Sequence, residues 1–134
     1  MVDNTTIVRN YLQRVWEQQD YTAIDETIKP DYIQHSRVVG QSGREPVKAF
    51  FQMVHNAFSD VKFTVEDMLA EGDKVAWRWT IQGRHSGIFQ GIPPTGKDFT
   101  LTGMSILRLE NGKFAELWVE QDMLGLIQQL RDGV

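Results

Sequence analysis

A strand pattern gives way to a helix pattern within KFAELWVEQDMLGLIQQL, residues Lys113–Leu130, and this change decides the fold. Apolar residues alternate along its first half, at Ala115, Leu117 and Val119, as they do in a half-buried strand. They recur at helical spacing along its second half, at Met123, Leu126, Ile127 and Leu130. Asp122 therefore stands at the junction between a strand and a helix.

Two roles suit a carboxylate at this junction. As a helix N-cap, Asp122 accepts hydrogen bonds from the amides of the first helical turn, which is the commoner role for aspartate at such a position. As a general acid/base, the same carboxylate is partly desolvated beside Trp118 and close to Glu120, which raises its pKa. The residues alone leave both roles open.

Strand geometry also predicts which side chains accompany this carboxylate. Residues two apart share a face of a strand. One face therefore combines aromatic rings with three carboxylates, in the series Phe114, Glu116, Trp118, Glu120 and Asp122.

The rest of the chain consists of helix patterns followed by strand patterns. Helical spacing predicts a helix from Asn4 to Trp16, a short one between Asp20 and Pro30, and a third from about Arg44 to Phe58. A short extended segment ends at His35, and long alternating segments follow from Val61 onward, the last two joined by the turn residues Asn111-Gly112. This order indicates an α+β fold, with helices packed into a strongly curved antiparallel sheet and a short C-terminal helix, as a single domain over residues 1–134.

Composition narrows the class of protein. The 134 residues carry a formal net charge of −4, which argues against a nucleic-acid partner because such proteins need a basic surface. There is no cysteine, and hence no thiolate nucleophile or thiolate metal site. The N-terminal residues lack the apolar core of a signal peptide, and no apolar run is long enough to span a bilayer, so we expect a cytoplasmic protein without a membrane partner.

Further candidate residues lie in the helices and strands. Tyr11 belongs to the apolar stripe of the first helix, either as a core residue or with its hydroxyl in a pocket. Trp77 and Trp79 share a strand face, either in ordinary core or at a pocket wall. His35 is either a structural residue or a proton-transfer group.

The connection GRHSGIFQGIPPTGKD, residues 83–98, is rich in glycine and proline yet carries apolar residues such as Phe89. Such side chains pack over the core edge, a partner subunit or a bound apolar ligand. The glycines match no phosphate-binding loop, and His35, His55 and His85 lack metal-ligand spacing, so we expect no metal site.

Two segments carry a resemblance to a known family. These are HSGIFQGIPPTGK, residues His85–Lys97, and WVEQDMLGLIQQL, residues Trp118–Leu130. In their order and spacing, and in the sequence of helices and strands around them, the chain resembles the SnoaL-like polyketide cyclase family over nearly its whole length. The resemblance implies a cone-shaped α+β barrel of the nuclear-transport-factor-2-like superfamily, commonly a homodimer, with an apolar pocket in the mouth of the cone.

The resemblance also implies a reaction. Characterised cyclases of this family close a ring of a polyketide by a cofactor-free intramolecular aldol condensation, and their acid/base aspartate falls at Asp122. His85 and His35 match recurrent histidines and become candidate donors to carbonyl oxygens, with Tyr11 as a further carry-over. The candidates that would line a pocket for an apolar carbonyl compound are Trp77, Trp79, Phe89, Trp118 and Glu120.

The scaffold does not fix the function. The same superfamily includes isomerases, dehydratases, epoxide hydrolases and binding modules without catalysis. A second hypothesis is therefore a small-molecule binding or carrier domain, in which Asp122 only caps the last helix. The position and partners of the Asp122 carboxylate distinguish the two hypotheses.

Overall fold

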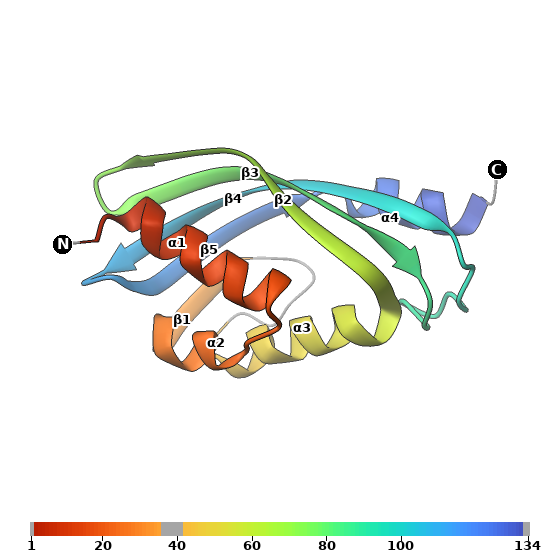
Figure 1. Cartoon of the computed structure of the whole chain (residues 1–134), viewed down its shortest axis with the longest axis horizontal. Coiled ribbons are helices and arrows are strands. Elements are labelled where there is room, and N and C mark those ends of the chain that lie inside the picture. The colour runs from red at the N-terminus through yellow and green to blue at the C-terminus, as the bar shows by residue number, and fades with distance from the viewer. Residues whose placement is uncertain (1, 36–41, 133–134) are drawn as a thin grey trace.

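Helices at the beginning of the chain lie against a long curved sheet in the computed structural model, which describes residues 2–35 and 42–132 (Figure 1). The elements are α1 (Asn4–Leu12), the π-helical turn η1 (Gln13–Glu17), α2 (Thr22–Thr27), β1 (Ile28–His35), α3 (Glu45–Ala57), β2 (Phe58–Glu71), β3 (Lys74–His85), β4 (Asp98–Glu110), β5 (Lys113–Gln121) and α4 (Met123–Asp132). This arrangement confirms the α+β prediction.

The strands form one mixed sheet in the order β1-β5-β4-β3-β2. The four long strands β2, β3, β4 and β5 pair with one another in antiparallel fashion, as predicted from the sequence. The short segment before His35 adds a fifth strand, β1, which pairs in parallel with β5. The sheet is strongly curved (Figure 1). It does not close into a barrel, because β1 and β2 remain as its two edges.

The helices α1, α2 and α3 cover one face of this sheet (Figure 1). Their apolar stripes supply the helical half of the core, including Val8 and Leu12 from α1 and Val47 and Phe51 from α3. The π-helical turn η1 continues the stripe of α1, and the ring of its Trp16 stacks on Phe63 at a centroid distance of 4.8 Å. The core therefore lies between the helices and the inner face of the sheet.

A register shift in the β4–β5 pair changes the face of β5 that each side chain occupies. Leu109 pairs with Phe114, whereas the preceding Arg108 pairs with Glu116, so Ala115 is an extra residue in β5. Such a bulge exchanges the two faces of the strand on either side of it. Phe114 is buried in the core, while Glu116 and the residues that alternate with it face away from the helices.

The prediction that Phe114 shares a face with Glu116, Trp118 and Glu120 is therefore wrong. That prediction requires uninterrupted alternation along β5, and the bulge breaks the alternation after Phe114. The inner face of β5 carries Phe114, Leu117, Val119 and Gln121 instead.

Gly103 in β4 makes room for the ring of Trp79 in the neighbouring strand. The two residues are paired in the β3–β4 register, and a Cβ atom on Gly103 would overlap the six-membered ring of Trp79. The absence of a side chain lets the indole lie flat against the backbone of β4. This contact fixes the orientation of Trp79 at the inner face of the sheet.

We expect the substitution Gly103→Ala to lower the free energy of unfolding by about 1–3 kcal/mol, because the added methyl group overpacks a rigid ring. Chemical denaturation of the wild type and the variant measures the loss. In a Trp79→Phe background, where the ring is smaller, the same substitution should cost less, and the loss that remains comes from the backbone oxygen of Glu120, 2.8 Å from the added Cβ atom. Equal losses in both backgrounds would contradict this packing argument.

Candidate functional site

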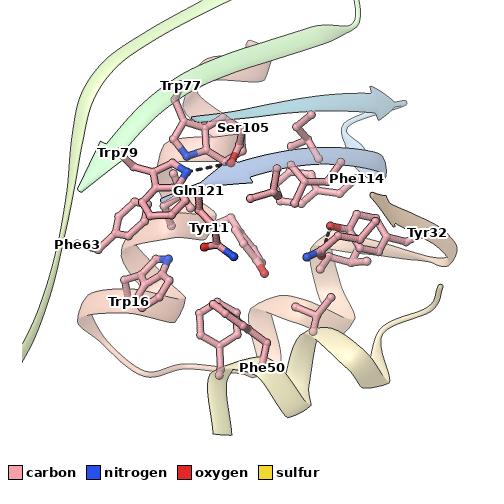
Figure 2. A pocket seen from close by; sticks show the side chains of 18 of the residues that line it. Tyr11, Trp16, Tyr32, Phe50, Phe63, Trp77, Trp79, Ser105, Phe114 and Gln121 are labelled. Carbon is pink, nitrogen blue, oxygen red and sulfur yellow. Dashed lines mark hydrogen bonds between the residues drawn. The ribbon is translucent and has the colours of Figure 1, made fainter. Parts of the chain in front are cut away.

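A cavity of about 110 Å³ lies between the inner face of the sheet and the helices (Figure 2). Its wall is mainly aromatic and aliphatic, and comes from α1, η1, α3 and all five strands. The lining residues are Tyr11, Leu12, Trp16, Ile28, Tyr32, Gln34, Val47, Phe50, Phe51, Phe63, Trp77, Trp79, Ile81, Ser105, Leu107, Phe114, Leu117, Val119 and Gln121. Concave apolar sites with a few polar groups are the usual form of small-molecule pockets.

The polar groups of this wall are all neutral at physiological pH. Burial raises the pKa of the Tyr11 hydroxyl and of the Tyr32 hydroxyl, so both stay protonated. The Tyr32 hydroxyl donates a hydrogen bond to Gln34 Oε1 at 2.9 Å. No described residue is hydrogen-bonded to the hydroxyl of Tyr11. Within the described parts of the chain, no carboxylate, histidine, lysine or arginine lines the cavity.

Three of the residues selected from the sequence do line this cavity: Tyr11, Trp77 and Trp79. The indole N–H of Trp79 donates to Ser105 Oγ at 3.0 Å, as the dashed line in Figure 2 shows. The indole nitrogen of Trp77 is buried and has no hydrogen-bond partner among the described residues.

Sequence reasoning missed Ser105 and Gln121, the polar residues that β4 and β5 contribute to the cavity. Ser105 was detectable as a hydroxyl on the apolar face of β4, at the alternation Leu101, Gly103, Ser105, Leu107. Gln121 was missed because the family resemblance pointed to its neighbours Glu120 and Asp122 as the candidates in this segment.

Asp122 lies outside the cavity wall, at the start of α4. Its side chain is exposed, and its Oδ1 accepts a hydrogen bond from the amide of Gly125 at 2.9 Å. A Cβ atom on Gly125 would overlap this carboxylate, so the glycine provides the space that the carboxylate occupies. Of the two roles open to Asp122, the geometry of the N-cap is present. Its neighbour Gln121 is the residue that reaches the cavity.

His85 is fully buried beyond the cavity and fastens the connection that follows β3. Its Nδ1 lies 3.0 Å from Thr95 Oγ1 and accepts from the Thr95 amide at 3.3 Å. The backbone of His85 also bonds to Gly96 and Lys97. Phe89 in the same connection is buried against Phe58, 5.1 Å between ring centroids, and lines a separate small space rather than the main cavity.

The remaining candidates lie on the outer face of the sheet. His35 Nε2 is 2.7 Å from Glu116 Oε2, and the His35 ring stacks on Trp118 at 5.2 Å. The hydrogen bond from His35 and, to a smaller extent, the one from Arg108 lower the pKa of the Glu116 carboxyl. Trp118 and Glu120 line a shallow hollow on this face. The bulge in β5 is the reason that Trp118 and Glu120 do not face the cavity.

Two further observations concern residues 2–35 and 42–132. No helix within these ranges is both long and apolar enough to cross a bilayer. No group of three or more histidine, aspartate or glutamate side chains lies close enough together there to hold a metal ion.

The architecture defines a class of small α+β proteins with an internal cavity between a curved sheet and helices. The chain belongs to the SnoaL-like polyketide cyclase family, whose model matches residues 6–130. It is 31% identical over 113 residues to nogalonic acid methyl ester cyclase of Streptomyces nogalater, which covers 81% of this chain and 84% of that relative.

Solved structures support this assignment. TsrD from Streptomyces laurentii superimposes with a TM-score of 0.86 at 29% identity, covering 100% of both chains. IdmH from Streptomyces antibioticus superimposes with a TM-score of 0.84 at 28% identity, covering 96% of this chain and 99% of that one. The curved open sheet with helices on its inner face is therefore the family's fold.

The cap geometry at Asp122 makes a prediction about stability. We expect Asp122→Ala to lower the free energy of unfolding by about 1 kcal/mol, because the amide of Gly125 loses its acceptor. Asp122→Asn should retain most of that stability, because asparagine caps helices about as well as aspartate. Denaturant unfolding of both variants measures the difference, and an equal loss for Asn and Ala would contradict the role of the side chain as a cap.

Proposed function

We propose that the inner cavity binds an apolar, polyketide-like carbonyl compound and that the protein promotes a cofactor-free proton transfer on it, such as an intramolecular aldol condensation. One observation carries this proposal: an aromatic cavity whose polar groups are neutral hydrogen-bond donors and amides. Such a wall suits a flat ligand whose oxygens are carbonyl groups rather than carboxylates. Membership of the family supports the same class of ligand.

The reaction requires a base and then an acid. In an aldol closure, the base removes a proton from the carbon next to a carbonyl group, and the C–H electron pair becomes the enolate. The enolate carbon then attacks a second carbonyl carbon of the same molecule, and the resulting alkoxide takes a proton back. No net oxidation or reduction occurs, so the reaction needs no redox cofactor.

We propose Asp122 as this acid/base group, in line with the family resemblance. Its Oδ1 bonds to the Gly125 amide, and its other oxygen accepts no hydrogen bond from a described residue. The adjacent Gln121 lines the cavity, so a ligand that extends past Gln121 approaches the start of α4. His35 and His85 take no part in this scheme, because His35 is paired with Glu116 on the outer face and His85 is buried against Thr95. Tyr11 and Trp77 serve as donors to the ligand.

The size of the cavity limits the ligand. An apolar cavity of about 150 Å³ holds a benzene molecule, so at about 110 Å³ this cavity has to widen slightly to take an aromatic ring. Phe50, Ile81 and Gln121 separate it from a second, apolar space of about 30 Å³ beside Phe89 and Met123. Phe50 is only half-buried, and a turn of its ring would join the two spaces and widen the site for one aromatic ring, while a polycyclic ligand requires a larger movement of the helices.

A second candidate function is binding without catalysis. The observation in its favour is that no described carboxylate lines the cavity, while Asp122 is exposed and already serves as a cap. The protein would then carry or sequester the same class of ligand.

The substitution Asp122→Asn separates these functions, because it removes the charge and keeps the cap. We expect the variant to bind nogalonic acid methyl ester, the compound in the relative's name, about as tightly as the wild type does. We expect it to close the ring at least 100-fold more slowly. Product formation is followed by chromatography. Asp98→Asn is a matched control, since Asp98 is an exposed carboxylate paired with Arg84, remote from the cavity.

Binding by the wild type without any conversion would support the carrier function instead. Conversion by Asp122→Asn at the wild-type rate would show that another group is the base.

We also propose that the outer face of the sheet forms a homodimer interface. Leu69, Met104 and Ile106 are 66%, 60% and 44% exposed there, and they surround the hollow lined by Trp118. Contiguous apolar side chains on one face of a sheet are typical of interaction sites. Arg78 and Glu120 in the same hollow provide charges of both signs, which suit pairing of the face with a second copy of itself.

We expect Met104→Asp to convert a dimer to a monomer in sedimentation velocity at micromolar concentrations, because it buries a charge in the apolar interface. Leu124→Asp is the matched control, since Leu124 is 69% exposed on α4 and lies outside this hollow. A monomeric wild type, or a Met104→Asp variant that stays dimeric, would rule out this interface.

A further inference from the structure

The hydroxyl of Ser105 occupies an unusual place in the inner wall of the cavity. Ser105 is only 5% exposed and lies among the apolar residues of the inner face of β4. Its oxygen accepts the indole N–H of Trp79 at 3.0 Å. Trp79 is held in place by its contact with Gly103, so this hydrogen bond is fixed by the packing of two strands.

The proton of this hydroxyl remains without an acceptor. A serine hydroxyl donates one hydrogen bond and accepts up to two. The bond from Trp79 uses one acceptor position, and no described residue receives the Ser105 proton. Buried donors are nearly always paired with protein or water, so an unpaired one in a cavity wall indicates a position where a ligand or a water molecule binds.

A second unpaired donor lies beside Ser105. Trp77 is directly opposite Ser105 in the β3–β4 register, and its buried indole nitrogen has no partner among the described residues. Figure 2 shows both side chains at the same end of the cavity, next to Trp79. Two neutral donors at the same end of the cavity match an atom that offers two lone pairs and carries no hydrogen, as a carbonyl oxygen does.

The electrostatics of the wall select among oxygen ligands. A carboxylate bound here would lose its hydration without gaining a cation, because no lysine or arginine among the described residues lines the cavity. A ketone oxygen has a much smaller desolvation cost and gains the same two hydrogen bonds. The site therefore discriminates in favour of neutral ketones over acids of the same shape.

We propose that Ser105, oriented by Trp79, and Trp77 form a subsite that binds the carbonyl oxygen of a neutral aryl ketone. This inference rests on the proposed function in one respect, namely that the ligand occupies the inner cavity. It does not depend on Asp122, on catalysis or on a dimer. It assigns Ser105 to ligand recognition and Trp79 to the positioning of the Ser105 hydroxyl.

Three probes of similar shape test the subsite: acetophenone, ethylbenzene and benzoate. They share one aromatic ring and differ in whether they carry a ketone oxygen, no oxygen or a carboxylate. We expect the wild type to bind acetophenone and ethylbenzene, and to bind benzoate at least 10-fold more weakly than acetophenone. Calorimetric titration gives the affinities, and the infrared C=O stretch of bound acetophenone reports the hydrogen bonds to its oxygen.

We expect Ser105→Ala to weaken acetophenone binding about 3- to 10-fold, to leave ethylbenzene binding unchanged and to shift the C=O stretch to higher frequency. Ser86→Ala is the matched control, because Ser86 is exposed in the connection after β3 and should change neither value. Ser105→Ala also leaves the Trp79 N–H unpaired. The same comparison is therefore made in a Trp79→Phe background, where that donor is absent and the loss of stability is smaller.

The outcomes separate the two proposals. If the wild type binds neither acetophenone nor ethylbenzene, the proposed ligand cavity fails and the subsite fails with it. If both bind but Ser105→Ala leaves acetophenone affinity and the C=O stretch unchanged in both backgrounds, only the subsite is overturned, and water satisfies these donors. An equal weakening for both probes would show a packing role for Ser105 and would also overturn the subsite.

Discussion

The bulge at Ala115 is the constraint on which the site depends. By adding one residue to β5 opposite β4, it turns Phe114, Leu117, Val119 and Gln121 toward the helices and the carboxylate-bearing residues toward the outer face. Because strand side chains alternate, one extra residue reassigns every side chain after it. The cavity is consequently lined by neutral groups, and Glu116 of β5 pairs with His35 and Arg108 on the outer face.

Most of the architecture followed from periodicity. The helices around Val8 and Phe51 and the four long strands were predictable because each has a long apolar pattern of one period. The parallel pairing of β1 with β5 was not, since a short extended segment carries no mark of its partner. Residues 36–41, which follow the extended segment that ends at His35, lie outside the described residues.

The candidate site was predicted less completely, for a physical reason. Tyr11, Trp77 and Trp79 were found because their faces follow from uninterrupted patterns. Trp118 and Glu120 were placed on the wrong face because a bulge leaves no clear signal in the residues that form it. Ser105 and Gln121 were missed because a single polar residue on an apolar face is not distinguishable from an ordinary satisfied polar group without its neighbours.

Two groups of polar residues at one end of the cavity suggest a division of labour. Ser105 lies beside the indoles of Trp77 and Trp79, while Gln121, next to them in Figure 2, leads toward the capped carboxylate at the start of α4. The account thus separates recognition of a carbonyl group from the acid/base step, and the two can be changed independently.

The location of the bound ligand tests the account most directly. Nuclear Overhauser effects between bound acetophenone and the indole protons of the four tryptophans report it, because Trp16 and Trp79 line only the cavity, Trp118 lines only the outer hollow and Trp77 lines both. The account predicts contacts to Trp77 and Trp79 and none to Trp118. Contacts to Trp118 alone would place the ligand on the outer face and contradict the account.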